Sequence, residues 1–160
     1  MTKEKLLRTL NTPWKLRLFL LSRLPAAWFV GLRLTSFTSE RAVVSLPYSW
    51  FSKNPFRSTY FAAQSAAAEF STGLLCLYAL TEQVPMSMLV VKMRANFYKK
   101  ADQTLFFQCD MGSVARAAVE KALATGAGVE VELQSEGRLP DGTLASQFWF
   151  TWSIKQKKGV

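Results

Sequence analysis

Glu69 is the residue whose position most strongly suggests chemistry. It lies in the run AAAEF at 66–70, and its nearest charged neighbours along the chain are Arg57 and Glu82. Burying an ionised carboxylate without partners is costly, so we expect Glu69 to be hydrogen-bonded, protonated or open to a pocket. A buried carboxylate beside a cleft is a candidate functional group. The structural alternative is a glutamate at the exposed edge of a helix, or one paired with a distant arginine.

The residue types that are absent narrow the possible chemistry. The chain has 160 residues, no histidine and two cysteines, Cys76 and Cys109, which lie far apart in apolar surroundings. The lack of histidine excludes Ser-His-Asp and Cys-His catalysis and histidine metal ligands. We interpret both cysteines as reduced core residues, with a disulfide or a reactive thiol as the alternative. We therefore expect no metal, and acid–base chemistry that relies on carboxylates, tyrosines or lysines.

The net charge of +9 is concentrated at the two ends of the chain. Residues 1–41 carry eight lysines and arginines against two glutamates, and the tail adds Lys155, Lys157 and Lys158. Basic ends can attract nucleic acid, anionic lipid or a phosphorylated ligand, and the alternative is a solvated surface. We do not expect nucleic-acid binding, because zinc spacing, Gly-rich loops and an aromatic RNA-binding signature are absent. Contact with a membrane surface is an alternative that we do not favour.

Two apolar stretches resemble membrane segments only superficially. Arginines interrupt residues 16–34, and Glu69 lies in the middle of residues 59–81, much of which is Ala and Ser. A spanning helix tolerates such charges poorly. We therefore expect a cytoplasmic protein.

The element that must position Glu69 is a long, alanine-rich helix expected over residues 59–80. Before it, we expect a helix over 13–24, capped by Thr12 and ended by Pro25, and then strands over 31–37 and 41–48. After it, the pattern predicts strands and one further helix in the order 86–98 (strand), 103–109 (strand), 113–124 (helix), 128–136 (strand) and 144–155 (strand).

These elements predict an α+β fold with an antiparallel sheet wrapped around the long central helix, plus an extra N-terminal helix. In the strand over 86–98, we expect one face to carry the apolar residues Leu89, Val91, Met93, Ala95 and Phe97. We divide the chain into a basic extension (1–12), a single domain (13–156) and a basic tail (157–160). Because the extension is short and highly charged, we expect it to be dispensable for folding.

The segment from Asn54 to Glu69 resembles the active-site segment of hot-dog acyl-CoA thioesterases of the phenylacetyl-CoA type. That family has an Asn, a His-Gly-Gly six residues later at a helix start, and an Asp or Glu nine residues after the His. Asn54 precedes Tyr60 by six residues, and Tyr60 precedes Glu69 by nine. Here Tyr60, Phe61 and Ala62 replace His-Gly-Gly. Over residues 13–156 the chain resembles an uncharacterised branch of this superfamily, known as a domain of unknown function.

The resemblance implies a hot-dog fold and hydrolysis of an acyl-CoA thioester, with Glu69 and Asn54 as catalytic residues. Glu69 would activate water or attack the thioester carbon, and Asn54 would position substrate or water. The backbone N–H groups of Tyr60 and Phe61 would stabilise the oxyanion. We also expect Asn54 and Glu69 to line one cavity.

The resemblance also implies binding partners. Arg57, Lys99 and Lys100 would meet the phosphates of coenzyme A, which enters as part of the substrate, so no separate cofactor is expected. The family's sites lie between subunits, which implies a homodimer or a tetramer. The alternative function is a non-catalytic protein that binds acyl-CoA or a fatty-acyl ligand, which the loss of His-Gly-Gly would suit.

Overall fold

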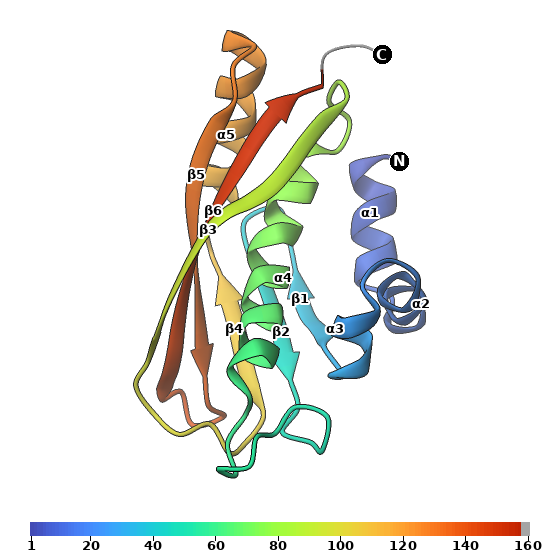
Figure 1. Cartoon of the computed structure of the whole chain (residues 1–160). Coiled ribbons are helices and arrows are strands. Elements are labelled where there is room, and N and C mark those ends of the chain that lie inside the picture. The colour runs from blue at the N-terminus through green and yellow to red at the C-terminus, as the bar shows by residue number, and fades with distance from the viewer. Residues whose placement is uncertain (158–160) are drawn as a thin grey trace.

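The computed structural model describes residues 1–157, so residues 158–160 of the predicted basic tail lie outside the described part. Figure 1 shows the elements in chain order: α1 (Lys3–Leu10), α2 (Pro13–Arg23), α3 (Pro25–Phe29), β1 (Arg33–Phe37), β2 (Ala42–Leu46), α4 (Phe61–Leu80), β3 (Met86–Phe97), β4 (Leu105–Cys109), α5 (Gly112–Thr125), β5 (Val129–Arg138) and β6 (Leu144–Gln156). The sequence pattern did not predict α3. Pro25 ends α2 as expected, but proline also fits the first position of a new helix.

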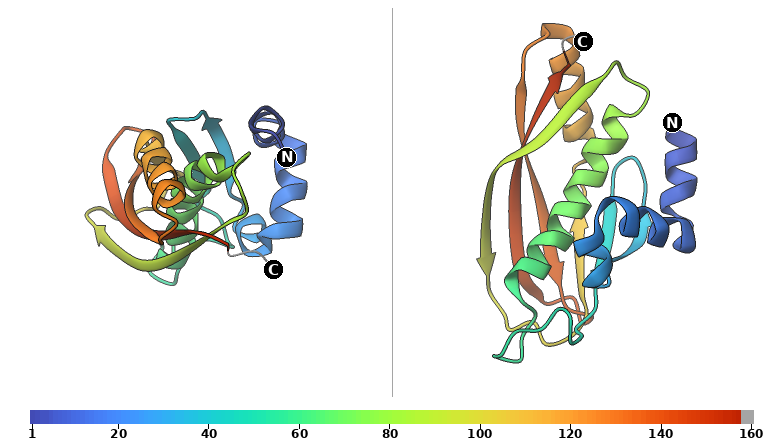
Figure 2. Two further views of the ribbon diagram at one scale, coloured as in Figure 1. Left: turned by 90° about the horizontal axis from the view of Figure 1, so that it is seen from above. Right: turned by 45° about the vertical axis from the view of Figure 1, so that its right-hand side comes forward.

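The strands form one six-stranded antiparallel sheet in the order β1-β2-β4-β5-β6-β3. The sheet curves around α4, and β1 and β3 are its edges (Figures 1 and 2). The predicted α+β architecture, a long central helix wrapped by an antiparallel sheet, is therefore confirmed.

Small side chains on α4 let the strands pack closely over the helix. The alanines buried in its first half are Ala63, Ala67 and Ala68. Two hydroxyl contacts fix the helix against the sheet. The Ser71 and Ser135 hydroxyl oxygens are 2.8 Å apart, and the Trp152 indole N–H donates to the Thr72 hydroxyl at 3.1 Å. Because these groups are buried, a shift of the helix along β5 and β6 would leave them without hydrogen-bond partners at a cost in free energy.

The edge strand β3 contains a bulge that changes which residues share a face. The register with β6 shifts at Val91, so the period-2 alternation is reset there. Met93 lies opposite the buried Phe150 on the inner face, whereas Leu89 lies on the outer face. The expectation of a single apolar face running from Leu89 to Phe97 is therefore wrong.

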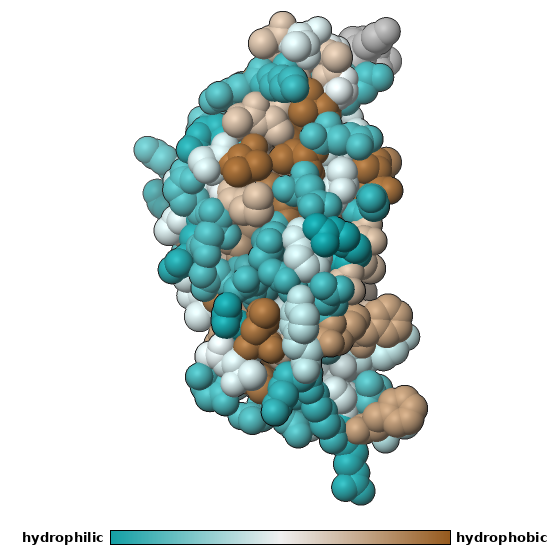
Figure 3. Space-filling view, turned by 90° about the vertical axis from the view of Figure 1, so that its left-hand side faces the viewer, coloured by the Kyte–Doolittle hydropathy of each residue, from teal (hydrophilic) through white to brown (hydrophobic). Residues whose placement is uncertain are grey.

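The outer face of the sheet is covered by mixed polar and apolar groups. The Arg94 guanidinium lies over the Trp149 ring, 3.8 Å from its centroid, and donates to the Glu132 carboxylate at 2.9 Å. Figure 3 shows hydrophilic residues interspersed with hydrophobic ones on this side of the molecule. Such a surface is suited to solvent.

Helix α1 is part of the domain core. Leu6 and Leu10 are both 1% exposed, and the Asn11 side-chain amide donates to the Phe37 carbonyl at 3.2 Å. The expectation that residues 1–12 are dispensable conflicts with this packing, because the two leucines form an apolar stripe among the charged residues. Losing a buried leucine typically costs about 2–5 kcal/mol, so we expect deletion of the segment to destabilise the domain.

Two further sequence expectations concern buried or apolar segments. Cys76 and Cys109 are free and buried, in agreement with the expected core thiols. Burial raises the pKa of each thiol to about 12, so both remain protonated near neutral pH. Within residues 1–157, no helix combines the length and the apolar composition needed to span a bilayer.

Candidate active site

The loop before α4 is shaped by Asn54. Its side-chain carbonyl accepts hydrogen bonds from the backbone N–H groups of Phe56 at 3.0 Å and Ser58 at 3.2 Å. This is the turn-forming behaviour of an Asn that precedes a proline. The Asn54 side-chain oxygen is therefore occupied by its own loop, and its amide group is the part that remains to contact a ligand.

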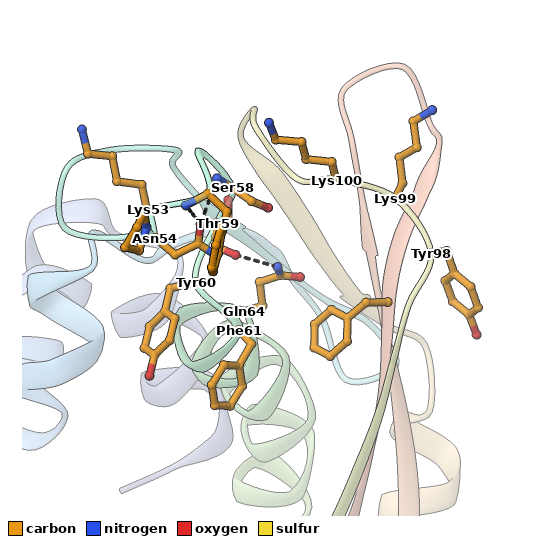
Figure 4. A pocket seen from close by; sticks show the side chains of 13 residues that line it. Lys53, Asn54, Ser58, Thr59, Tyr60, Phe61, Gln64, Tyr98, Lys99 and Lys100 are labelled. Atoms are coloured by element: carbon orange, nitrogen blue, oxygen red, sulfur yellow. Dashed lines mark hydrogen bonds between the residues drawn. The ribbon is translucent and has the colours of Figure 1, made fainter.

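An open cavity of about 790 Å³ lies between this loop, the start of α4 and the end of β3 (Figure 4). Its lining residues are Lys53, Asn54, Pro55, Phe56, Ser58, Thr59, Tyr60, Phe61, Gln64, Phe97, Tyr98, Lys99 and Lys100. In Figure 4, the Lys53, Lys99 and Lys100 side chains extend away from the helix, whereas Tyr60 and Phe61 lie beside its first turn. The cavity thus combines a basic rim with an aromatic wall, a combination that suits a ligand with an anionic end and an apolar end.

Of the two backbone N–H groups at the start of α4 that were predicted to donate to an oxyanion, one is free and the other is occupied. Tyr60 is the N-cap, and its N–H donates to the Ser52 carbonyl at 2.7 Å, so the predicted oxyanion donor at Tyr60 is occupied. Phe61 is the first residue of the helix. Its N–H has no acceptor within the helix, because the first N–H groups of any α-helix lack one. Of the two predicted donors, Phe61 is therefore the one available to a ligand.

Gln64 is a cavity residue that the sequence reasoning missed. It is only 4% exposed, its amide N–H donates to the Thr59 carbonyl at 3.1 Å, and its side-chain oxygen accepts from the Ser146 hydroxyl at 2.8 Å. It thereby ties the helix start to both the loop and β6. A single amide within an alanine-rich run was the available signal for a buried polar contact.

Glu69 lies in a second, smaller pocket of about 170 Å³. The other lining residues are apolar: Phe19, Leu24, Phe70, Gly73, Leu74, Leu77, Met88 and Trp152. The carboxyl group is half-buried and has no side-chain hydrogen bond to any residue in 1–157, and this burial raises the pKa of Glu69. Gly73 leaves room for it, since a Cβ atom at 73 would lie 3.5 Å from the Glu69 carboxylate and 3.2 Å from the Trp152 ring.

Asn54 and Glu69 therefore line different pockets of the single chain, and the expectation that they share one cavity is wrong for an isolated copy. Helix geometry explains the separation. From Tyr60 to Glu69 the chain rises about 13 Å along the helix axis and makes about two and a half turns around it. Positions 60 and 69 therefore point to opposite sides of the helix. A carboxylate from the middle of α4 cannot reach the start of the same helix.

Two of the three basic residues predicted to bind the ligand line the large cavity, and the third does not. Lys99 and Lys100, predicted to bind the ligand, line the large cavity, and so does Lys53, which the sequence pattern did not single out. Arg57 belongs to the same loop, where its backbone N–H donates to the Asn54 carbonyl, but it is not among the lining residues. Within residues 1–157, no three His, Cys, Asp or Glu side chains converge on a possible metal position.

The sequence matches one family model. This model is described as "Domain of unknown function (DUF4442)" and covers residues 13–154. The chain belongs to this family. No curated protein matches the chain.

Solved structures that resemble this member of the family include several described as thioesterases. A protein of unknown function from Pseudomonas aeruginosa, described as a probable thioesterase, has a TM-score of 0.74 and 16% identity over 91% of this chain and 97% of that one. A putative thioesterase from Shewanella oneidensis has a TM-score of 0.74 and 15% identity, with 95% and 99% covered. A protein of unknown function from Chlorobaculum tepidum has a TM-score of 0.76 and 13% identity, with 94% and 99% covered. These similarities show a hot-dog fold, as the sequence resemblance implied.

Proposed function

We propose that this protein hydrolyses acyl-CoA thioesters, with Glu69 as the general base or the nucleophile. The observation that carries this proposal is a half-buried Glu69 carboxyl in an apolar pocket, with no side-chain hydrogen-bond partner within residues 1–157. Placing it there is costly for folding, and no structural contact offsets the cost. Because burial raises the pKa of Glu69, the carboxylate is also a stronger base than an exposed glutamate.

In this proposal, a second copy of the chain completes the reaction centre. The helix-start cavity includes Phe97 at one end of β3, and the Glu69 pocket includes Met88 near the other end. If β3 pairs antiparallel with its copy about a two-fold axis, Phe97 of each copy lies near Met88 of the other. Each helix start then meets the partner subunit's Glu69.

The exposed residues of β3 support this pairing. It is a 12-residue edge strand, and Leu89, Val91, Met93 and Phe97 are 66%, 46%, 43% and 52% exposed. A long apolar edge strand normally requires a covering partner. We therefore propose a homodimer, with a tetramer as a further assembly of dimers.

The proposed reaction uses few groups. Glu69 removes a proton from water while the water oxygen bonds to the thioester carbon, and the carbonyl oxygen becomes an oxyanion. The Phe61 N–H, at the positive end of α4, donates to that oxyanion. When the C–S bond breaks, coenzyme A leaves as a thiolate and takes the proton from Glu69, and the free acid is released. In the alternative route, Glu69 attacks the carbon itself, and water then hydrolyses the resulting anhydride.

The basic rim of the large cavity would hold the coenzyme A part of the substrate. Lys53, Lys99 and Lys100 are exposed at the rim and carry no ion pair with any residue in 1–157. Ammonium groups at a cavity mouth attract phosphates. Arg57 projects from the same loop and would contribute at longer range.

Two observations favour the non-catalytic alternative, an acyl-CoA or fatty-acyl binding protein. Phe61 occupies a position where thioesterases of the resembled type have glycine, and its side chain is 53% exposed at the cavity. The neighbouring Tyr60 N–H is occupied by Ser52. Both features reduce the access of a carbonyl group to the helix start.

Thiol release from a panel of short, long and aryl acyl-CoAs tests the proposal. Glu69→Gln keeps the shape of the side chain but removes the base, so we expect turnover to fall by about 10²–10⁴-fold. Glu120→Gln, an exposed glutamate on α5, is the matched control and should retain wild-type turnover. The enzyme proposal fails if wild type and Glu69→Gln release thiol equally, or if neither exceeds background. Acyl-CoA binding without turnover would support the alternative.

A further inference from the structure

Helix α2 has apolar residues on two opposite faces. Leu16 and Leu20 are buried against the rest of the domain at 4% and 0% exposed. Trp14, Leu18 and Leu21 follow one another at spacings of four and three residues, which places them along the outward face, where they are 62%, 57% and 49% exposed. A helix at a protein–water boundary normally carries polar residues on that face. We call these three residues the α2 stripe.

Exposed aromatic rings lie beside the helix that follows α2. Phe29 of α3 and Phe51 of the loop after β2 have ring centroids 6.4 Å apart, and Trp50 lies 5.1 Å from Phe51. Their side chains are 59%, 60% and 75% exposed for Phe29, Phe51 and Trp50 respectively. We call these three residues the aromatic cluster. Figure 2 shows α2 and α3 on the side of α4 that faces away from α5 and β5.

The charge around the α2 stripe is entirely positive along the chain. Residues 5–39 contain six lysines and arginines and no acidic residue. The Lys15 amine lies 5.4 Å from the Trp14 ring centroid, and the exposed Arg17 and Arg23 belong to the same helix. Leucine and tryptophan on one face with lysine and arginine beside them are typical of helices that lie in the plane of an anionic membrane surface.

We propose that the α2 stripe and the aromatic cluster dock this protein on the surface of an anionic lipid bilayer. A symmetric contact between two copies through α2 would bring the same basic groups face to face, which is unfavourable. Nucleic acid would satisfy the charges but would leave Leu18 and Leu21 in water. A bilayer with anionic headgroups satisfies both the charges and the apolar side chains.

Docking in this way also has a consequence for the large cavity. The loop that carries Trp50 and Phe51 continues into the lining residues Lys53 and Asn54. The cavity would therefore lie close to the bilayer, and ligands with long apolar chains would have a short path into it. The docking itself does not depend on the proposed catalytic function, and it can be measured in the absence of any acyl-CoA.

Flotation of the full chain with phosphatidylcholine vesicles, with and without phosphatidylserine, tests the proposal. We expect the wild type to bind the phosphatidylserine vesicles at least about tenfold more strongly than pure phosphatidylcholine, and binding to weaken as salt rises. Leu18→Ser with Leu21→Ser should lower this affinity at least about tenfold, since both side chains would leave the acyl boundary. Val84→Ser with Val114→Ser removes exposed apolar side chains elsewhere and should leave binding unchanged.

A second measurement relies on the wild type and on one conservative substitution that keeps an aromatic ring at position 14. Brominated lipids in the vesicles should quench tryptophan fluorescence of the wild type, and Trp14→Phe should show less quenching. The proposal is overturned if the wild type does not bind phosphatidylserine vesicles, if the leucine variant binds as well as wild type, or if brominated lipid causes no quenching. It is also overturned if the leucine variant sediments at a lower mass than wild type, which would make this face an interface between copies. Salt-sensitive DNA binding without vesicle binding would likewise overturn it.

Discussion

The first turn of α4 and the middle of α4 differ in nearly every property that matters for catalysis. The first turn opens into a cavity of about 790 Å³ with a lysine rim and free backbone donors. The middle faces a pocket of about 170 Å³ that is apolar except for Glu69. The first region is suited to binding an anionic ligand and stabilising negative charge, and the second to holding a strong base. Neither region has the complete set of groups for hydrolysis, which is why we propose that two copies together form the site.

A large effect is expected from removing the backbone donor at the helix start. Phe61→Pro deletes this N–H while keeping a residue that the first helical position accepts, and Tyr60 already has the extended backbone that precedes proline. Loss of one oxyanion donor should lower kcat about 10²–10³-fold. Phe61→Ala is the control, because it removes the same ring but keeps the N–H. Equal kcat values for the two variants, both folded by circular dichroism, would show that the helix start does not act as we propose.

The next effect concerns the edge strand that is proposed to join the two regions. Val91→Lys places a new charge near the middle of β3, where a two-fold axis would bring it close to its own copy. We expect the variant to sediment as a monomer. Its turnover should fall more than about tenfold, since each site would lack the partner's Glu69. Val114→Lys on α5 is the control and should keep both mass and turnover. A fully active Val91→Lys monomer would separate catalysis from dimer formation.

A smaller effect follows from the raised pKa of Glu69. Burial favours the protonated form in the folded state, so the folded chain binds a proton more tightly than the unfolded chain, and stability falls as the pH rises through the raised pKa. Glu69→Gln should therefore raise the melting temperature at neutral pH, and this difference should shrink near about pH 4, where glutamates become protonated. Over the same range, wild-type kcat/KM should rise with pH as the base ionises. Calorimetry at both pH values checks the sign, and a constant difference would contradict it.

Much of the fold could be predicted because local patterns and tertiary packing agree. The alanine-rich run around Glu69 favours a helix intrinsically, and the alternation of Val129, Val131 and Leu133 predicts a strand with one solvent-exposed face. The bulge at Val91 could not be predicted from the sequence, because an inserted residue leaves the apolar–polar alternation normal in both halves of the strand. The packing of helix α1 could not be predicted from its composition, because the buried leucines at positions 6 and 10 stand among charged residues.

The candidate site was less predictable, for a geometric reason. The spacing of Asn54, Tyr60 and Glu69 identified the residues worth attention but not which of their atoms are free. The Asn54 side-chain oxygen accepts a hydrogen bond from the Ser58 N–H, and the Tyr60 N–H donates to the Ser52 carbonyl. Both hydrogen bonds depend on the backbone turns of the loop, which the spacing of the residues does not determine. The burial of Gln64 could not be predicted from the sequence, because a glutamine within a helix is usually a surface residue.

The central claim is that the start of α4 in one copy acts with Glu69 of the other, and mixed dimers test it most directly. Glu69→Gln and Phe61→Pro chains are each expected to be nearly inactive alone. Unfolded and refolded together at equal amounts, half of the dimers would be mixed, and each mixed dimer would contain one site with both groups intact. We predict recovery of about a quarter of wild-type thiol release, from random pairing at a two-fold interface. If the mixture remains as inactive as its two components, the two regions do not act across the subunit boundary.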